Sequence, residues 1–556
     1  MRTLPVVLAT CAALIATEAS FAQRRPPPPA QDHGATWYVR EDGGSAAQCT
    51  GRYDRPYPGS GSGRACAWSS LHVALPTSDS PRIDGGDTVY VAPGSYRTGW
   101  GGPGVEQSGR CSADSPSGCY LAAVPSGPSS GRPTRILGGG PASGKCVDPS
   151  QLWGAQRVAT VLNLEGSSHV QLACLEVTDR SDCIEAHTDT ATRCPRSAAP
   201  QGDWAATGIL ARASEDVLLR DLDVHGLANT GIRAGDLADW SLVRVRIVAN
   251  GWAGWDGDIG ADSANSGRLD FREVEIGWNG CGERWQTGAI HGCWAQQAGG
   301  YGDGLGTATT GGHWLFQDSV IHHNTSDGLD LLYLDGGPDA SVVVRRVFAQ
   351  GNAGNAIKTH GRAVIENSVV VGDCAYFEGR FFMTAGDQCR AQGNSLSVGL
   401  SPGQPAVVRH NTVVGEGDCL LVSSGGNAAS SLAVVNNAWL GDVDWTGAPG
   451  ERSCGHYAQS QPAATSYSGN LYWRVKNGFC PVDSVCGLDP GLADPAMGSF
   501  DPMPLPGSAL LDRVSYLPAA GRDFHLRPRP NGSAADIGAV ERQVQPPAPP
   551  GRRGTR

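Results

Sequence analysis

An asparagine recurs behind short apolar runs in the middle of this chain, and this recurrence restricts the fold more than any other feature. Repeats of twenty to fifty residues are typical of solenoid architectures. A period in the twenties with several short strands per repeat predicts a parallel β-helix, and the longer middle interval indicates a doubled or inserted turn. The intervals are 29, 45 and 28 residues between Asn250, Asn279, Asn324 and Asn352.

The composition agrees with a repeat architecture. The 556 residues include 77 glycines and only 4 methionines, and short Val/Ile/Leu runs alternate with Asn, Asp and Gly clusters. This pattern predicts many strands and tight turns with little room for long helices. Because no obvious linker divides the middle of the chain, one elongated domain is favoured over two or three globular ones.

The N-terminus predicts export. Residues 1–22 carry a basic Arg2, an apolar run from Leu4 to Ile15 and a small-x-small site at Ser20–Ala22, as in a secretory signal peptide. The apolar run is too short to span a membrane. Leu8–Cys11 loosely resembles a lipoprotein box, with threonine where a smaller residue is expected. The sequence therefore predicts a secreted protein, extracellular or periplasmic.

The remaining chain divides by pattern. Helical spacing in Cys66–Leu75 predicts a helix that caps the open end of the coil. Pro506–Asp512 and Asp523–Glu541 are predicted to form a closing segment that docks on the coil. The predicted divisions are a Pro-rich spacer (23–35), a cap with the first strands (36–156), the β-helix core with the candidate site (157–440), C-terminal strands with the closing segment (441–541) and a disordered tail (542–556).

Cysteine usage predicts disulfides. Loss of Cys11 with the signal peptide leaves 16 of the 17 cysteines, an even number in an exported chain. A zinc site is disfavoured because no Cys-x-x-Cys pair occurs. Pairing of sequence neighbours is a hypothesis that the sequence cannot establish. It joins Cys49–Cys66, Cys111–Cys119, Cys146–Cys174, Cys183–Cys194, Cys281–Cys293, Cys374–Cys389, Cys419–Cys454 and Cys480–Cys486.

Aligning the repeats on a shared small–apolar step predicts which residues stack. Because neighbouring strands lie about 4.8 Å apart, this register stacks Asp303, Asp327 and Asn355 and places Lys358 beside Asp330. Strict alternation directs Asp330 outward, whereas the direction of Asp327, beyond an Asp-Gly corner, cannot be obtained by counting. The predicted inward ladder is Ile232, Leu305, Leu329 and Ile357.

Stacked carboxylates provide the hard oxygen ligands that calcium prefers. Asp303, Asp327 and Asp330 are the candidate metal ligands, and Asp335 or Asp339 could contribute from the next turn. The alternative is that these aspartates only form turns, since Asp-Gly is ordinary turn chemistry.

Lysine is rare here, and its position is informative. It occurs only at Lys145, Lys358 and Lys476, whereas arginine supplies nearly all other positive charge. Lysine can lose its proton when burial or neighbouring cations lower its pKa, whereas arginine stays protonated. Lys358 is therefore the candidate base, and a salt bridge with Asp330 is the structural alternative.

These motifs resemble those of the family 9 polysaccharide lyases. The resemblance rests on Asp303, the Asp327–Asp330 segment and Gly354–Gly361. It implies a secreted bacterial right-handed parallel β-helix, with calcium held by Asp303, Asp327 and Asp330, and with Lys358 removing the C5 proton of a uronate in β-elimination. The chain departs from the family pattern in two places: Ser326 stands where a further aspartate is usual, and Thr359-His360 replace part of a Gly-Phe-Lys-Leu-Gly-Gly type run.

Basic side chains near this stretch are candidate substrate contacts. Some lie in the loop between Cys374 and Cys389, whose aromatic residues predict either an overhang above a sugar groove or a hydrophobic flap on the coil. The candidates are Arg345, Arg346, His360, Arg362, Arg380 and Arg390.

The net charge of −11 argues against nucleic acid as a partner. An acidic polysaccharide would need a bridging cation or a local arginine cluster, and the protein is expected to be a monomer. Two other functions stay open: a glycoside hydrolase that uses Asp256, Asp258 and Asp262, and a non-enzymatic carbohydrate-binding or surface protein. A transition-metal site is a further alternative, formed from His291, His322, His323 and His360.

Overall fold

The computed structural model describes residues 34–139, 146–184, 203–259, 264–294, 301–337, 339–380, 383–384, 393–415, 419–441, 454–459, 463–476 and 478–543. The predicted signal peptide and most of the spacer therefore lie outside the described residues, as do Asp262, Arg390 and the tail from residue 544. None of the helices in the described part of the chain is long and apolar enough to cross a membrane.

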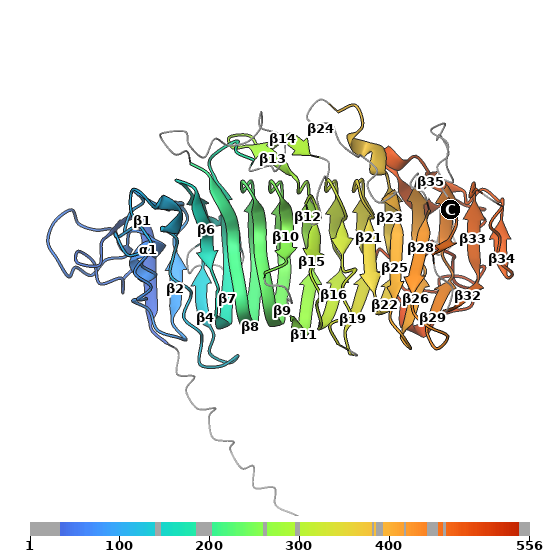
Figure 1. Cartoon of the computed structure of the whole chain (residues 1–556), viewed down its shortest axis with the longest axis horizontal. Coiled ribbons are helices and arrows are strands. Elements are labelled where there is room, and N and C mark those ends of the chain that lie inside the picture. The colour runs from blue at the N-terminus through green and yellow to red at the C-terminus, as the bar shows by residue number, and fades with distance from the viewer. Residues whose placement is uncertain are drawn as a thin grey trace, which may run out of the picture. The chain divides into compact units, whose positions relative to one another are not determined.

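Gly34–Arg556 forms one unit whose strands pair in parallel with those of the next turn, which confirms the predicted parallel β-helix. Thirty-one strands join this array (Figure 1). They fall into three stacks. Three long strands bend so that they run from one stack into another: β7 (Ser168–Asp179), β8 (Ala205–His225) and β9 (Thr230–Val248).

The site stack carries the residues singled out by the sequence. After the first parts of β8 and β9 it is built from short strands, each in register with the next. Its members are β6 (Val158–Asn163), β8, β9, β10 (Ala253–Gly257), β15 (Leu305–Thr307), β18 (Leu329–Asp330), β21 (Ile357–His360), β25 (Leu396–Leu400), β28 (Leu421–Gly425) and β31 (Tyr457–Ala458).

The second and third stacks complete each turn. The second consists of β1 (Thr36–Gly44), β2 (Thr88–Val91), β4 (Thr134–Leu137), β7, β8, β9, β11 (Ser266–Arg272), β16 (His313–Gln317), β19 (Ser341–Arg345), β22 (Arg362–Glu366), β26 (Pro405–Arg409), β29 (Ser431–Val435) and β32 (Ala464–Ser468). The third consists of β3 (Ser95–Thr98), β5 (Ser150–Gly154), β7, β8, β9, β12 (Glu275–Gly277), β17 (Val320–His322), β20 (Phe348–Gln350), β23 (Val369–Gly372), β27 (Thr412–Gly415), β30 (Ala438–Gly441), β33 (Asn470–Trp473) and β34 (Ser484–Cys486).

The inward ladder of the site stack agrees with the predicted register and adds one rung. Leu305, Leu329 and Ile357 are in register and fully buried. Between Ile232 and Leu305 lies Trp255 of β10, which pairs with both. Because an indole takes the place of an aliphatic side chain there, alignment on small apolar residues passes over this turn.

The 45-residue interval contains an insertion rather than a doubled turn, because β12 pairs directly with β17. The insertion includes an antiparallel hairpin of β13 (Cys281–Arg284) and β14 (Ala289–Trp294), which β24 (Met383–Thr384) extends. These three strands lie at one edge of the coil in Figure 1.

The recurring asparagines form a buried hydrogen-bonded ladder. The Nδ2 of Asn279 donates to Oδ1 of Asn324 at 2.9 Å, and the Nδ2 of Asn324 donates to Oδ1 of Asn352 at 2.8 Å. Each side chain also binds backbone, as Asn324 Nδ2 does at Ile276 O. The asparagine that the sequence repeats is therefore the residue that satisfies buried backbone groups at one corner of the coil.

Replacing Asn324 with alanine is expected to lower the free energy of unfolding by about 2–4 kcal/mol, because it leaves several buried donors and acceptors of Asn279 and Asn352 without partners. Urea unfolding followed by circular dichroism measures this change. Gln286→Ala, in the exposed turn of the β13–β14 hairpin, is the control and should unfold with the wild type. Equal stability of Asn324→Ala and wild type would contradict the role of the ladder.

The predicted cap helix and the predicted closing segment differ in how they contact the coil. The cap helix is short: α1 comprises only Leu71–Ala74, all buried, within the helical spacing of Cys66–Leu75. The closing segment packs along the third stack, where Ile537 and Val540 join a buried cluster with Val414 of β27. The antiparallel pair β35 (Leu492–Asp494) and β36 (Asp501–Pro504) precedes the closing segment. The short 3-10 turns are η1 (Pro116–Gly118), η2 (Cys374–Phe377), η4 (Met497–Ser499) and η5 (Pro518–Ala520).

Six predicted disulfides are confirmed among the described residues. They crosslink turns and insertions that are close in sequence, as the neighbour pairing predicts. The partners proposed for Cys183 and Cys374, which are Cys194 and Cys389, lie outside the described residues. The six are Cys49–Cys66, Cys111–Cys119, Cys146–Cys174, Cys281–Cys293, Cys419–Cys454 and Cys480–Cys486.

A half-buried histidine, His225, joins the β13–β14 hairpin to the third stack. His225 Nδ1 lies 2.7 Å from Glu283 of the hairpin, and its Nε2 lies 3.1 Å from Glu176 of β7. Burial alone would lower the pKa of His225, but hydrogen bonds to Glu176 and Glu283, together with the charge of Asp223, raise it to about 10. The imidazolium therefore neutralises carboxylates that would otherwise repel one another.

The stability that His225 contributes is expected to depend on pH. Because its pKa is raised on folding, the contribution is complete below about pH 6.5 and is lost as the pH rises toward about 10. The difference in unfolding free energy between wild type and His225→Gln should therefore shrink by about 3 kcal/mol from pH 6 to pH 9. Urea unfolding at both pH values tests this, with His313→Gln, an exposed histidine, as the control. A difference independent of pH would contradict the ion pairing.

Candidate functional site

The aspartates of the site stack form a ladder where the short strands begin. Asp303 Oδ1 accepts a hydrogen bond from the backbone N–H of Asp327 at 3.1 Å, and Asp327 Oδ1 accepts from the N–H of Asn355 at 2.5 Å and from its Nδ2 at 2.9 Å. The stacking predicted from the register is therefore present. One oxygen of each aspartate holds the next turn of the coil.

The other oxygen of Asp327 faces Lys358. Lys358 is in register with Asp330, as predicted, and its Nζ lies 2.8 Å from Asp327 Oδ2 and 2.8 Å from Asp330 Oδ2. The Oδ1 of Asp330 accepts from the N–H of Leu332 at 3.0 Å. All three charged side chains are at most 17% exposed. The salt bridge expected as the structural alternative for Lys358 is thus present, with two carboxylates rather than one.

Burial and charge determine the protonation of this cluster. Burial alone would lower the pKa of Lys358, but the carboxylates of Asp327 and Asp330 raise it above its ordinary value. Burial together with Asp327 raises the pKa of Asp330 to about 6, although Lys358 opposes this. Burial, Asp327 and Asp330 raise the pKa of Asp303 well above its usual range. One ammonium therefore does not compensate the three carboxylates.

The donor chemistry at this place is that of a hard cation. The described residues contain no group of three or more His, Cys, Asp or Glu side chains already gathered as a metal site. The carboxylates of Asp327 and Asp330 do, however, bind a cation of the protein's own, the ammonium of Lys358. Asp303, Asp327 and Asp330 offer the all-oxygen ligands that calcium takes, so the residue types fit the ion.

A small hollow lies beside this cluster. Two aspartates that line it, Asp256 and Asp258, were predicted from the sequence for a glycoside hydrolase instead. The hollow measures about 70 Å³ and is lined by Asp256, Asp258, Asp303 and Asp330. The hollow exists because Gly306 stands between Asp256 and Asp330 in the register, and a Cβ there would lie 2.9 Å from Asp303 Oδ2. Alignment of the Trp255-Asp256 step with Leu305-Gly306 is the sequence signal that could have placed Asp256 here.

Several predicted substrate contacts lie away from Lys358. The guanidinium of Arg345 pairs with buried Glu366, and that of Arg346 pairs with Asp318. Arg345 is the last residue of β19 in the second stack, and Arg346 follows it. Arg380 lies over the ring of Tyr376, with Cζ 3.6 Å from the ring centroid. Arg345 and Arg346 therefore belong to another stack than the candidate base and have carboxylate partners of their own.

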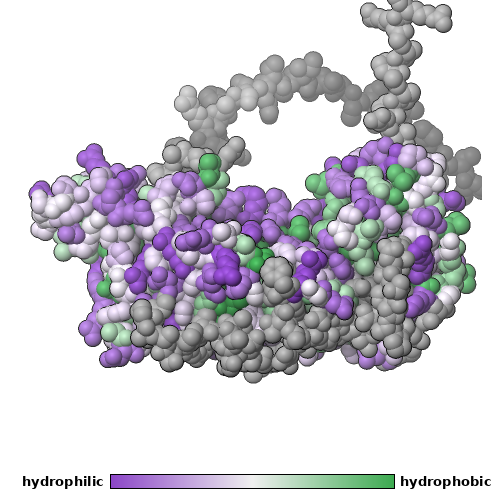
Figure 2. Space-filling model, turned by 90° about the horizontal axis from the view of Figure 1, so that it is seen from above, coloured by the Kyte–Doolittle hydropathy of each residue, from purple (hydrophilic) through white to green (hydrophobic). Residues whose placement is uncertain are grey.

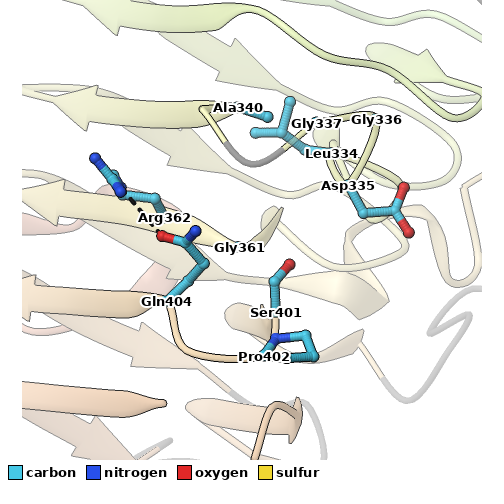
Figure 3. A pocket seen from close by; sticks show the side chains of 10 residues that line it. All are labelled: Leu334, Asp335, Gly336, Gly337, Ala340, Gly361, Arg362, Ser401, Pro402 and Gln404. Atoms are coloured by element: carbon cyan, nitrogen blue, oxygen red, sulfur yellow. Dashed lines mark hydrogen bonds between the residues drawn. The ribbon is translucent and has the colours of Figure 1, made fainter. Parts of the chain in front are cut away.

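The remaining candidates follow Lys358 along the chain. His360 lies on the same strand, β21, and its Nδ1 hydrogen-bonds Leu332 O at 2.6 Å. Arg362 opens β22 and lines a cavity of about 560 Å³ at the corner between the site stack and the second stack (Figure 3). This corner cavity also contains Asp335, which the sequence placed among possible metal ligands.

The histidines of the transition-metal alternative are spread over different elements. His322 and His323 adjoin at the third stack, with their Nδ1 atoms 2.8 Å apart, and His322 Nε2 lies 3.2 Å from Glu275. His291 belongs to β14, whereas His360 belongs to the site stack.

No protein-family model matches the chain, and no curated protein matches it. Among solved structures, the chain is similar to pectate lyase Pel9A, with 11% identity, a TM-score of 0.41 and coverage of 92% of this chain and 98% of that one. An alginate lyase from Paenibacillus sp. str. FPU-7 has 14% identity and a TM-score of 0.32, with coverage of 69% of this chain and 92% of that one. XylC in complex with xylose has 9% identity and a TM-score of 0.40, with coverage of 91% of this chain and 99% of that one. Similarities of this size assign neither a family nor an activity.

Proposed function

We propose that this protein is a secreted polysaccharide lyase that cleaves a uronate-containing polysaccharide by β-elimination, with Lys358 as the base and calcium held by Asp303, Asp327 and Asp330. The observation that supports it most is the position of Lys358 on the outer face of the site stack, in contact with both Asp327 and Asp330. The disulfides of the described residues favour an exported protein.

In the proposed reaction Lys358 Nζ takes the proton from C5 of the uronate. The electrons of the C5–H bond form the C4=C5 double bond as the bond from C4 to the glycosidic oxygen breaks. The oxygen leaves with the electron pair of that bond and takes a proton from water. Calcium, when bound, would withdraw charge from the uronate carboxylate and make the C5 proton more acidic. Lys358 can act as a base only when its contacts with Asp327 and Asp330 weaken, because those contacts keep it protonated.

The experiment is incubation of the secreted protein with pectate, alginate and other uronate polymers, with calcium or with a chelator. The absorbance of the unsaturated product in the ultraviolet reports elimination. The proposal expects that absorbance with at least one polymer and its loss in chelator. New reducing ends without the absorbance, or binding without cleavage, would contradict it.

A glycoside hydrolase is the second candidate, and the hollow at Gly306 is the observation that favours it. Asp256 and Asp258 line it together, and burial and the charge of Asp256 raise the pKa of Asp258. Two neighbouring carboxyl groups, one of them with a raised pKa, are the kind of pair that glycoside hydrolysis uses. Reducing ends that appear without ultraviolet absorbance, and disappear in Asp258→Asn, would support this function instead.

A further inference from the structure

The corner cavity lies directly beside the proposed reaction centre. It begins at Gly361, which directly follows β21 and lies three residues, or about 10 Å of extended chain, from Lys358. The turn that follows Asp330 joins the two places, since Tyr333 lines the hollow at Gly306 and Leu334 lines the corner cavity. A sugar chain that reaches Lys358 can therefore extend into the cavity without leaving the surface of the coil.

Three successive turns of the coil form the cavity. Leu334 and Asp335 follow β18, Gly361 joins β21 to β22, which begins at Arg362, and Ser401 and Gln404 precede β26. Gly361 has a φ of +73°, and a Cβ there would lie 3.2 Å from Ser401 Oγ. Glycine thus keeps the floor of the cavity open. A volume of about 560 Å³ is within the usual range for small-molecule sites.

The cavity holds one positive and one negative side chain that do not pair with each other. Arg362 Nε donates to Gln404 Oε1 at 3.2 Å. Within the described ranges no carboxylate lies within ion-pair distance of Arg362, whereas nearby Arg345 and Arg409 both pair with Glu366. Figure 3 shows Asp335 on the opposite side of the cavity from Arg362, with Gly361 and Ser401 between them.

These groups define the chemistry of a ligand. A guanidinium with free N–H groups binds a carboxylate, because its planar donors match the two oxygens. A carboxylate on the far wall accepts hydrogen bonds from hydroxyls. The ring of Tyr333, which is 50% exposed, offers an apolar face between the two places. On the face seen in Figure 2, hydrophilic residues are interspersed with apolar ones.

We infer that the corner cavity is a subsite for one acidic sugar of the substrate, next to the residue that reacts at Lys358. Arg362 binds the sugar's carboxylate and Asp335 accepts from its hydroxyls. Tyr333 supports the linkage between the two sugars. This inference rests on the proposed function for the position of the reacting sugar, and it adds the residues that select an acidic neighbour.

Binding of tetragalacturonate, tetramannuronate and neutral galactotetraose, measured by calorimetry in calcium, tests the subsite. The full chain carries Lys358→Met throughout, so that no ligand is consumed. Arg362→Gln is expected to weaken binding of the acidic tetramer about tenfold. Asp335→Asn should weaken it severalfold. Both side chains are exposed, so the fold should be retained.

Arg268→Gln is the matched control, because Arg268 is an exposed arginine of the second stack; its binding should equal that of the parent. Unchanged affinity in Arg362→Gln overturns the inference. Preference for the neutral tetramer, or binding of no tetramer by the parent, overturns it as well. If Arg362 is required for binding but the wild type forms no unsaturated product, the subsite stands and the proposed function fails. If the chain with Lys358 intact forms unsaturated product and Arg362→Gln does not change that rate, the proposed function stands and the subsite fails.

Discussion

Replacing Lys358 with arginine is expected to lower the rate of uronate elimination by about 10²–10⁴-fold, the usual contribution of a general base. Arginine keeps the positive charge that pairs with Asp327 and Asp330, but it does not give up its proton near neutral pH. The fold and the ion pairs should therefore survive while the base is lost. Product absorbance at saturating polymer measures the rate, and circular dichroism checks the fold.

Lys476→Arg is the control for this substitution. Lys476 is an exposed lysine in a late turn of the coil, and its replacement should leave the rate unchanged. If Lys358→Arg retained the wild-type rate, Lys358 would have only the structural role that its two ion pairs suggest. Another group, such as a carboxylate of the hollow at Gly306, would then have to remove the proton.

The main features of the candidate site followed from the register of the repeats. Because side chains alternate along a strand, aligning Leu329 with Ile357 necessarily places Asp330 beside Lys358, and the structure has this pairing. The direction of Asp327 could not be obtained in this way, because it lies before the strand, where alternation does not hold. Its contact with Lys358 depends on a side-chain torsion that the sequence pattern does not determine.

The surroundings of Arg345, Arg346 and Asp256 were not predicted correctly, because residues close in sequence were expected to be close in space. Arg345 and Arg346 lie within fifteen residues of Lys358 in sequence, but a coil of three stacks carries them to another face, where Glu366 and Asp318 pair with them. Asp256 is distant in sequence, yet it is only two rungs from Asp330. Its turn was passed over because Trp255 stands at the aliphatic position.

Calcium and the Lys358 ammonium are expected to compete for the same carboxylates. The ammonium lies 2.8 Å from an oxygen of Asp327 and of Asp330, and the remaining oxygens of both residues bind backbone N–H groups. Two unit charges about 4 Å apart near a protein surface interact by roughly 4 kcal/mol. Lys358→Met should therefore bind calcium about 10²-fold more tightly than the wild type, or by ~2.7 kcal/mol.

Calorimetric titration of the metal-free full chain with calcium measures this competition without reference to activity. Lys358→Arg should bind calcium about as the wild type does, because it keeps a cation between the carboxylates. Arg233→Met controls for the loss of a positive charge at longer range. Arg233 Nε lies 3.5 Å from Asp256 Oδ2, so this arginine pairs with Asp256 rather than with Asp327 or Asp330. An equal gain in Arg233→Met would show that net charge rather than shared ligands governs the affinity. No gain in Lys358→Met would mean that calcium does not use Asp327 and Asp330, and the proposed ligand set would be wrong.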